Sequence, residues 1–392
     1  MKITFVSRIY APETSAASTY LAAVAGRFAA RGHRVTVLTA RPPKGLNPAE
    51  PGDVRVRRAR VIRDANGYVR GYVPYLSFDV PLLGRLLFAR RSDLYFVEPP
   101  PTTGFVVRII GALRRTPYVY RAADLWSDAA ATTTSSRFVL RSLRMVELWA
   151  IRGSRMSFAA SAGLLDRMRE LGIESPGMVA GHGADTESYR YEDQVEQSEG
   201  PYFIYGGTYS EWQGAVVFVD AFARFVRDHP GYRLIFIGNG SDRALLKARV
   251  TALGLTSVEF RDPVPGPVLN RLLNGAVASV VSLRPGMGYD YAFPSKIYTS
   301  LAAGCPVLFA GTGPTALFLR EAAREVEPGV ATDYEPAEVS AAMGLLADQP
   351  VAPEARRRLS DWARERYSLT ATADRVVSAC EQVVGRSGRT GT

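Results

Sequence analysis

Pro294–Leu308 reads PSKIYTSLAAGCPVL, the pattern of a short helix that leads into a buried strand. Ser295 is of a residue type that caps helices, and Gly304 is of the type that ends them, here before the apolar run that begins at Pro306. The apolar positions in between recur at helical spacing, at Ile297, Leu301 and Ala302. A helix that feeds a strand in this way predicts an α/β fold with a parallel sheet.

Lys296 occupies the first turn of this expected helix. Backbone N–H groups at a helix start have no partner within the helix, so a cation beside them suits the phosphates of a nucleotide or a sugar nucleotide. The chain has four Lys residues against forty-four Arg, which makes lysine an uncommon choice for a position without a special role. The alternative is a simple helix start with a solvated side chain.

The rest of the chain alternates short apolar runs with helical patterns, as doubly wound α/β domains do. We expect strands near 3–7, 34–39, 94–98, 117–121 and 156–160, and again near 202–205, 233–238, 258–260, 278–282 and 307–309. The predicted organisation is a Rossmann-like domain at 1–188, an acidic linker at 189–200, a second Rossmann-like domain at 201–367, a helix at 368–384 that packs back on the first domain, and a disordered tail at 385–392. Open sheets of this kind bind ligands beyond the carboxyl ends of their strands, here in a cleft between the two domains.

Composition limits the function classes. The chain of 392 residues is 47% apolar, which is enough for two domains with separate cores. Two Cys and three His provide neither a disulfide framework nor a metal cluster, so no metal site is expected. The first residues enter a strand pattern directly and no apolar run is long enough to span a bilayer, so we expect a cytoplasmic protein.

The net charge of +10 is unevenly distributed. Residues 1–190 carry 28 Lys and Arg against 15 Asp and Glu, a net +13, whereas the remainder carries 20 against 23, a net −3. The basic half predicts an acidic partner, either anionic lipid head groups, a lipid pyrophosphate or nucleic acid. Nucleic acid is disfavoured because no basic helix with regularly spaced aromatic residues stands out.

Two segments of the basic half have surface patterns. Arg55–Arg63 alternates charged and apolar residues, as an exposed edge strand does. Tyr68–Arg91 interleaves aromatic side chains with Leu, Val and Arg, as a surface at a membrane interface does. The alternative for the second segment is a core helix over 81–91 preceded by a strand.

The PSK segment resembles the donor-site signature of retaining glycosyltransferases of family 4, which have the GT-B fold of two Rossmann-like domains facing across a cleft. Within that family, the segment is most similar to a branch that reads PSK-x-x-E-x-x-A-x-G-x-P-V. This branch resembles the transferases of bacterial surface-polysaccharide assembly. Where that branch has a glutamate for the ribose hydroxyls, this chain has Thr299, and the partner glutamate of other branches would fall at Tyr291. Asp290 is the nearest acid that can substitute.

The resemblance extends to other loops of the second domain. Gly206–Gly214 occupies the place where many members have an Arg and a Lys on the donor diphosphate, and those positions are Thr208 and Gln213 here. The charge on the diphosphate would then fall to Lys296 and Arg284. The donor-binding residues implied are Gly207, Thr208, Gln213, Gly238, Asn239, Gly240, Arg284, Asp290, Tyr291, Pro294, Ser295, Lys296 and Thr299.

In the first domain, Tyr120–Asp128 (YRAADLWSD) resembles the V-R-D-L-W-P of the branch at the end of a strand. Asp124 is the expected catalytic acid, which would orient the acceptor hydroxyl or take its proton, with Lys296 as the second catalytic residue. The alternative is that Asp124 caps the helix that follows. Near the first strand, the branch has a Y-x-P-E motif that matches Tyr10–Glu13. The acceptor-binding residues implied are Glu13, Thr14, Ser15, Arg121 and Trp126.

The resemblance implies a retaining, metal-independent hexosyltransferase that moves a sugar from a nucleotide-sugar donor, most simply a UDP- or GDP-sugar, and needs no other cofactor. The acceptor would be a glycan or glycolipid of the cell surface, met at the inner face of the membrane. One alternative is a soluble small-molecule natural product glycosylated from an unusual donor. Another, of a different class, is a degenerate, non-catalytic scaffold or activator, and a sugar-nucleotide epimerase is a minor option.

Overall fold

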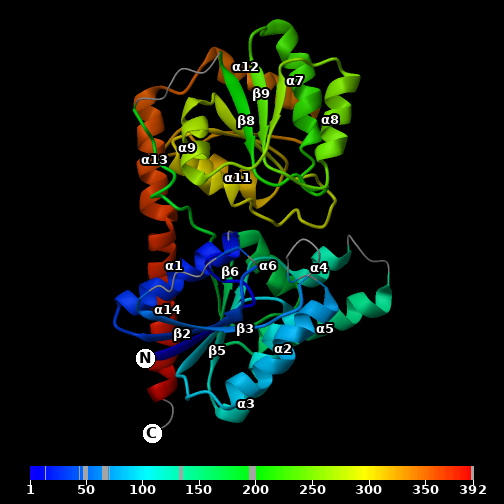
Figure 1. Ribbon diagram of the computed structural model, residues 1–392. Helices are drawn as coiled ribbons and strands as arrows, with labels where there is room; N and C mark the ends of the chain where they lie inside the picture. The colour runs from blue at the N-terminus through cyan, green and yellow to red at the C-terminus, as the bar shows by residue number, and fades with distance from the viewer. Residues whose placement is uncertain are drawn as a thin grey trace. The chain divides into compact units, whose positions relative to one another are not determined.

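The computed structural model describes residues 1–13, 15–43, 45–46, 52–63, 69, 71–131, 136–193 and 200–389 (Figure 1). The chain forms two compact units. The first unit is Met1–His182 together with the chain from Leu369 onward, and the second is Gly183–Ser368. The chain thus passes from one unit to the other at 182–183, ahead of the acidic segment at 189–200, of which residues 194–199 lie outside the described residues.

The first unit is built on a seven-stranded parallel sheet in the order β3-β2-β1-β4-β5-β6-β7. Its strands are β1 (Lys2–Val6), β2 (Arg34–Ala40), β3 (Val54–Ala59), β4 (Leu94–Val97), β5 (Tyr118–Ala122), β6 (Met156–Ala159) and β7 (Gly177–Val179). Its helices are α1 (Ala16–Ala30), α2 (Tyr72–Leu87), α3 (Pro101–Arg114), α4 (Trp126–Ala131), α5 (Arg137–Arg152), α6 (Ala162–Glu170) and α14 (Leu369–Arg389). All five strands expected in this half are present, and the charged β3 lies at the sheet edge as its alternating pattern predicts.

The central strands of this sheet are buried on both faces, which is why they appear in the sequence as continuous apolar runs. Phe5 of β1 stacks on Phe96 of β4 with ring centroids 4.7 Å apart, and Phe96 stacks on Phe158 of β6 at 5.8 Å. Offset aromatic contacts of this kind add to the free energy gained by burying the rings.

The second unit has a six-stranded parallel sheet in the order β10-β9-β8-β11-β12-β13. Its strands are β8 (Tyr202–Gly206), β9 (Arg233–Ile237), β10 (Val258–Arg261), β11 (Ala278–Ser282), β12 (Val307–Ala310) and β13 (Gly329–Thr332). Its helices are α7 (Val216–Asp228), α8 (Arg243–Ala252), α9 (Gly266–Gly275), α10 (Lys296–Ala302), α11 (Pro314–Ala322), α12 (Pro336–Asp348) and α13 (Pro353–Tyr367). The five expected strands are present, and β13 adds a short, half-buried edge that the sequence analysis does not predict.

The PSK segment forms α10 followed by β12, as the sequence predicts. Ser295 precedes the helix but already has helical backbone angles and makes no side-chain capping bond, so its expected capping role is wrong. Gly304 ends the helix with a φ of 67°, and a Cβ there would lie 2.6 Å from the carbonyl oxygen of Arg356. No other residue fits this position without displacing α13.

The segment at 68–91 does not form the strand and the helix over 81–91 that one of its two interpretations expects. A single helix, α2, runs through it from Tyr72 to Leu87 with Pro81 inside, so the predicted strand and helix start at Pro81 are wrong. Phe78, Leu82 and Leu86 of this helix are fully buried. Packing of this buried face stabilises the helix despite the missing N–H of the proline.

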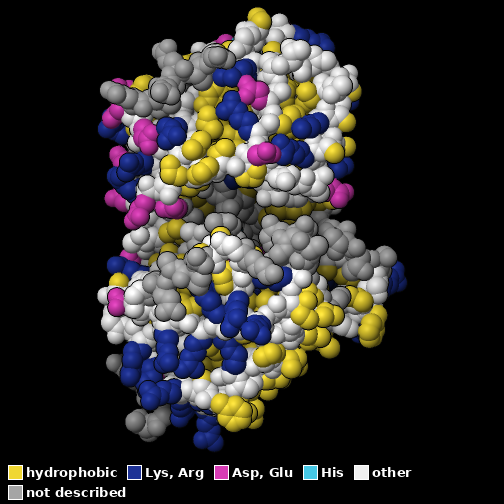
Figure 2. Space-filling view, viewed as in Figure 1, with side chains coloured by type: hydrophobic (Ala, Val, Ile, Leu, Met, Phe, Trp, Pro, Cys, Tyr) yellow, Lys and Arg dark blue, Asp and Glu magenta, His cyan; other side chains and the backbone are white. Residues whose placement is uncertain are grey.

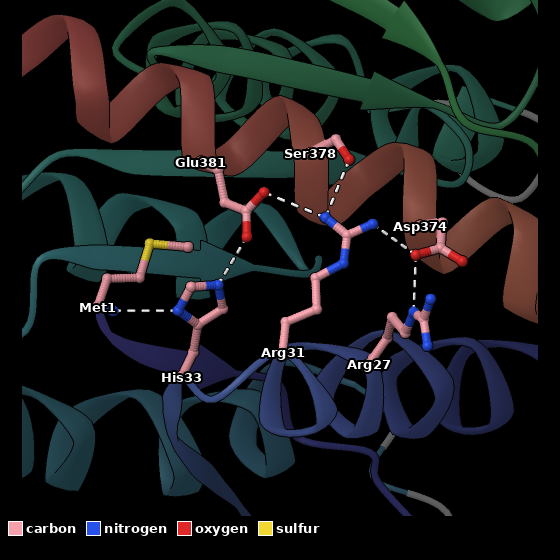
Figure 3. Close-up of polar contacts among 7 residues, drawn as sticks. All are labelled: Met1, Arg27, Arg31, His33, Asp374, Ser378 and Glu381. Atoms are coloured by element: carbon pink, nitrogen blue, oxygen red, sulfur yellow. Dashed lines mark hydrogen bonds and ion pairs between the residues drawn. The ribbon is translucent and has the colours of Figure 1, made fainter.

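The last helix, α14, lies along α1 and completes the core of the first unit with Val376, Val377 and Cys380. Polar contacts surround this apolar seam (Figure 3). Asp374 accepts from Arg27 and Arg31, and Glu381 accepts from Arg31 and from His33, whose ring also accepts from the amino group of Met1. The helix continues to Arg389, beyond the end at 384 and into the tail that the sequence analysis expects to be disordered.

Asp374→Asn is expected to loosen α14. Asp374 bonds to two arginines, at 2.7 Å and 2.5 Å, and these arginines lower the pKa of its partly exposed carboxyl group. Loss of two such pairs costs about 1 kcal/mol, so the amide hydrogens of α14 should exchange about fivefold faster at pH 7. Mass-spectrometric hydrogen exchange measures this. Asp361→Asn removes an exposed pair on α13 and should leave α14 unchanged, whereas equal exchange in both variants would contradict the prediction.

Candidate functional site

Lys296 at the start of α10 carries a buried ammonium group. Its Nζ atom is shielded from solvent and, within the described residues, has no hydrogen-bond acceptor. Nζ lies 3.8 Å from the centre of the Tyr205 ring, and a Cβ placed on Gly207 would be 3.3 Å from it, so the side chain reaches the end of β8. Burial lowers the pKa of Lys296 to about 7. An ammonium group in this state gains from any anion that comes within reach.

Two loops meet beside Lys296 at the carboxyl ends of β8 and β9. Gly207 N donates to Ile237 O at 2.8 Å, and Tyr209 N donates to Asn239 O at 3.1 Å. Gly238 has a φ of 138°, and a Cβ there would lie 1.9 Å from the Gly207 carbonyl oxygen. Gly238-Asn239-Gly240 therefore permits the two backbones to run against each other, at the end of the sheet where α/β domains bind ligands.

The two residues that stand in place of the expected loop cations differ in orientation. Thr208 is exposed on the loop after β8. Gln213 is buried, its Oε1 accepts from Tyr205 at 3.0 Å, and its backbone carbonyl accepts from Ser282 at 2.6 Å. The side chain of Gln213 thus braces the loop from inside, and Thr208 alone of the pair faces outward.

Arg284 is a second cation beside this loop. It follows β11, its N–H donates to Trp212 O at 2.9 Å, and its Cβ lies 3.0 Å from where Gly214 would carry one. The Arg284 side chain is exposed and makes no ion pair within the described residues. Lys296 and Arg284 thus both contact the glycine-rich segment that follows β8.

Aromatic side chains from the segment between β11 and α10 pack against Trp212 of the loop after β8. Trp212 stacks on Tyr289 with ring centroids 4.8 Å apart, and the ring of Tyr291 is 6.4 Å from that of Tyr289. Asp290 is exposed, and its Oδ1 accepts from Gly286 N at 3.0 Å. One oxygen of that carboxylate therefore stabilises its own loop, and the other has no bond to the described residues.

The remaining donor-site residues lie around the start of α10. Pro294 is buried and its carbonyl oxygen accepts from Ile297 N at 3.1 Å. Ser295 is half-buried, as is Thr299, which lies one turn after Lys296 on the same side of the helix. Since α10 has seven residues, its contribution rests on the Lys296 side chain more than on the aligned peptide dipoles.

In the first unit, Asp124 lies between β5 and α4. It is half-buried and makes no hydrogen bond within the described residues. Burial raises the pKa of its carboxyl group, Arg121 opposes this shift, and Glu98 adds to it. The side chain is thus a carboxylate of raised basicity that no donor among the described residues occupies.

The alternative in which Asp124 caps the following helix is wrong, because Glu147 of α5 takes that role. The Glu147 carboxylate accepts from Trp126 N at 2.7 Å and from Ser127 N at 2.9 Å. Burial raises the pKa of Glu147 to about 7 despite these bonds. Sequence reasoning missed this residue, and its one signal was a lone acid in an otherwise basic and apolar helical pattern.

Arg121 is turned into the protein. Its Nη1 donates to Glu98 at 2.7 Å, and its guanidinium lies 3.9 Å from the centre of the Tyr20 ring. His182 faces the same group at 3.5 Å, and burial together with Arg121 lowers its pKa to about 3, so this histidine is neutral at pH 7. Arg121 therefore balances the charge of buried Glu98, and both groups influence the pKa of Asp124.

Arg8 is a further cation that influences the pKa of Asp124, and the sequence analysis missed it. The guanidinium of Arg8 is 4.2 Å from the ring centre of Tyr75 and 5.0 Å from that of Trp126. Its Nη1 donates to Val69 O at 2.9 Å. The signal available in the sequence was its position directly after the first strand, at the carboxyl end of the sheet.

The other expected acceptor residues have partners within the first unit. Glu13 pairs with Arg63 at 3.0 Å, and both side chains are largely buried. Ser15 caps α1 by accepting from Ser18 N at 3.1 Å. Thr14 lies outside the described residues.

Each unit thus presents reactive groups at the carboxyl end of its own sheet. The second unit offers cations beside a glycine-rich loop, which suits a diphosphate. The first offers Asp124, a carboxylate with no donor among the described residues, which suits a hydroxyl group. Among the described residues, no group of three or more His, Cys, Asp or Glu side chains is placed to hold a metal ion. None of the helices within the described ranges is long and apolar enough to cross a membrane.

Comparisons with known proteins agree with this division. A family model described as a glycosyl transferase 4-like domain matches residues 15–180, and one described as glycosyl transferases group 1 matches residues 200–349. No curated protein sequence matches the chain.

Solved structures resemble the whole chain. A sucrose-phosphate synthase from Thermosynechococcus elongatus has a TM-score of 0.78 at 15% identity, covering 98% of this chain and 99% of its own. HepE of Anabaena, solved with UDP and glucose, has a TM-score of 0.71 at 18% identity, covering 97% and 99%. WaaG, a glycosyltransferase involved in lipopolysaccharide biosynthesis, has a TM-score of 0.67 at 14% identity, covering 96% and 99%. At these identities the likeness shows the fold, and the expected pair of Rossmann-like domains of the GT-B type is confirmed.

Proposed function

Because this chain belongs to the glycosyltransferases that join a 4-like domain to a group 1 domain, we propose that it transfers a sugar, with retention, from a nucleotide-sugar donor to an acceptor hydroxyl. The observation that carries the proposal is the buried Nζ of Lys296, which has no acceptor within the described residues and lies at the glycine-rich loop after β8. A donor diphosphate supplies the missing anion.

In this mechanism the second unit stabilises the departing diphosphate. Lys296 meets its negative charge from a desolvated position, where electrostatic interactions are strong, and Arg284 adds a second, solvated cation. The exposed Thr208 hydroxyl contributes a neutral donor from the same loop. Two side-chain cations meet the charge of the leaving group, so the proposal needs no metal ion.

Asp124 acts on the acceptor in the first unit. A carboxylate with raised pKa, and with no donor in the described part of the chain, can orient a hydroxyl group and accept its proton as the new glycosidic bond forms. Trp126, which is half-buried and packs against Arg8, offers an aromatic ring on which a sugar ring of the acceptor can stack. We assign Asp124 and Lys296 as the catalytic pair of the proposal.

We propose a UDP-sugar as donor, with a GDP-sugar as the alternative. HepE, which shares the fold, was solved with UDP and with UDP-glucose. For the acceptor we favour a cell-surface glycan or glycolipid, met by the basic first unit at the inner face of the membrane, since WaaG is involved in lipopolysaccharide biosynthesis. AviGT4, a glycosyltransferase involved in avilamycin A biosynthesis, also shares the fold and represents the alternative of a soluble natural product.

A second candidate is a non-catalytic scaffold. The observation in its favour is that Gln213 is turned inward and Thr299 replaces a carboxylate, so two expected donor contacts are weaker than in the resembling branch. Nucleotide binding separates the two candidates, because a scaffold that has lost its donor site does not bind the nucleotide.

We expect UDP or UDP-glucose to raise the thermal unfolding midpoint of the full chain. A ligand present at 100 times its Kd adds about 2.7 kcal/mol to the folded state, or roughly 5–10 °C for a unit of this size. Differential scanning fluorimetry with UDP, GDP, ADP and their glucose conjugates measures this. A shift with one base only supports the transferase, whereas no shift with any of them favours the scaffold.

A further inference from the structure

The helix α2 presents an apolar stripe to solvent. Five of its residues are spaced three and four apart along one face, and their exposed fractions range from 37% to 63%: Val73, Leu76, Val80, Leu83 and Leu87. Phe88, directly after the helix, is 86% exposed. The opposite face of α2 is buried in the first unit, so the helix has two apolar faces, and only one of them is covered.

Helix α2 packs against α3, and α3 packs against α5. The apolar surface continues over both of these helices. Phe105 of α3 contacts Trp149 of α5 with ring centroids 4.9 Å apart, and Phe138 and Met145 of α5 are 80% and 67% exposed. Figure 2 shows apolar side chains gathered over α2, α3 and α5. Exposed apolar side chains that continue over neighbouring helices mark a site of interaction.

Charges on these three helices are all of one sign at the surface. Their two carboxylates, Asp79 and Glu147, are 2% and 1% exposed and bind groups inside the unit. Seven arginines lie on the same helices: Arg85, Arg108, Arg114, Arg137, Arg141, Arg144 and Arg152. The apolar surface is therefore interleaved with cations, and no acidic side chain of these helices is exposed.

A basic hollow adjoins the end of the α2 stripe. Its volume is about 550 Å³, and the connection from α2 to β4 forms one wall. Six cationic side chains line it: Lys2, Arg34, Arg55, Arg57, Arg90 and Arg91. Asp53 also lines the hollow, yet within the described residues none of the six cations forms an ion pair. Lys and Arg side chains dominate this part of the surface in Figure 2.

Arginine side chains join the hollow to the stripe by donating to backbone carbonyl oxygens. Arg114 of α3 donates to Ala89 O at 2.8 Å and also to Leu87 O, at the carboxyl end of α2. Arg85 of α2 donates to Arg57 O of the edge strand at 2.7 Å. The apolar stripe therefore ends at a fixed position beside the cations.

We propose that this face of the first unit docks onto an anionic lipid bilayer. The α2 stripe lies in the boundary between head groups and acyl chains, and a lipid phosphate occupies the basic hollow. Arg137 and Arg141 of α5 are exposed, and they extend their charged ends toward the head groups while their stems cover apolar surface. A second copy of this chain is a poorer occupant, since pairing two such faces would bring their arginines together with no exposed acidic side chain on these helices to oppose them.

The test is co-sedimentation of the full chain with vesicles of phosphatidylcholine, with and without phosphatidylglycerol. We expect binding to the anionic vesicles, weakened by salt, and little binding to the neutral ones. The triple variant R55Q/R90Q/R91Q should lower the partition coefficient about 100-fold, as expected for three cations near an anionic surface. The variant L76Q/V80Q/L83Q should lower it about 10-fold or more.

Matched controls come from the second unit. R271Q/R320Q/R324Q removes three exposed arginines, and L245Q/L317Q/L345Q removes three leucines that are 57%, 56% and 49% exposed. Both should bind vesicles as the unaltered chain does, and circular dichroism checks the fold of every variant. The inference does not rest on the proposed function, because vesicle binding is measured without donor or acceptor.

Three results would overturn the proposal. The first is a failure of the unaltered chain to bind anionic vesicles. The second is an equal loss of binding in the control variants. The third is light scattering that shows a dimer of the unaltered chain converted to a monomer by L76Q/V80Q/L83Q, which would make this face an interface between copies.

Discussion

Asp124→Asn is expected to lower kcat about 1,000-fold while the affinity for the donor stays the same. The amide has nearly the shape of the carboxylate but cannot accept the proton of the acceptor hydroxyl, and a positioned general base contributes about 100- to 10,000-fold to the rate. Donor affinity is retained because Asp124 belongs to the first unit and the cations assigned to the donor belong to the second. Steady-state kinetics with titration calorimetry of UDP measures both quantities.

The pH profile gives this prediction a second readout. Burial raises the pKa of Asp124, so the base is active above that raised value, and kcat should fall as the pH drops through it. Asp124→Asn should remove this acidic limb from the residual activity. Asp166→Asn, an exposed change in the same unit, should leave rate and profile unaltered. A kcat of Asp124→Asn within a few-fold of the unaltered enzyme would exclude Asp124 as the base.

Lys296→Met is expected to weaken binding of UDP-glucose about 100-fold at pH 6. Methionine keeps the length of the side chain and removes the charge-assisted contact, which is worth about 1.5–3 kcal/mol. Lys247→Met is the matched control, because Lys247 is an exposed lysine of the same unit. If both variants bind as the unaltered chain does, Lys296 does not contact the donor.

The same site predicts a pH dependence of donor binding. Burial sets the pKa of Lys296 at about 7 in the free protein, and a bound diphosphate should raise it toward its ordinary value of 10.5. Binding above pH 7 therefore takes up a proton, and affinity should fall about 100-fold between pH 6 and pH 9. UDP-glucose is the suitable ligand because its phosphates do not titrate in this range. Lys296→Met should bind with no such slope.

Most of the strands could be predicted from the sequence because both sheets bury their central strands on two faces. Leu94–Val97, for example, is short, apolar and bounded by Asp93 and Glu98, and a parallel sheet is the common structure with that pattern. β13 escaped prediction because GVAT is short, half-buried and at the sheet edge, where the apolar signal is weak.

The course of α2 could not be predicted from local signals. Pro81 is typical of a helix start, yet the helix runs through it because Phe78, Leu82 and Leu86 are buried inside the first unit. This burial depends on which elements lie next to each other in the fold. Local propensity carries no information about that arrangement.

Side-chain direction limited the prediction of the site. The sequence located the loop at 206–214 but did not indicate that Gln213 turns inward to Tyr205. Likewise, Trp126 is bound by Glu147 from another helix, a contact that joins positions with no local pattern in common. Lys296 and Asp124 could be singled out because the resemblance rests on short motifs that include them.

The position of α14 sets the order in which the protein can be completed during synthesis. The core of the first unit includes Val376, Val377 and Cys380, so a ribosome that has made the whole second unit has still not supplied the residues that finish the first. The second unit has all of its residues before the first does, although the first begins earlier. Until its last helix is made, the nascent first unit exposes the apolar side of α1. A chain that stops before α14 should therefore leave the first unit, and not the second, with an incomplete core.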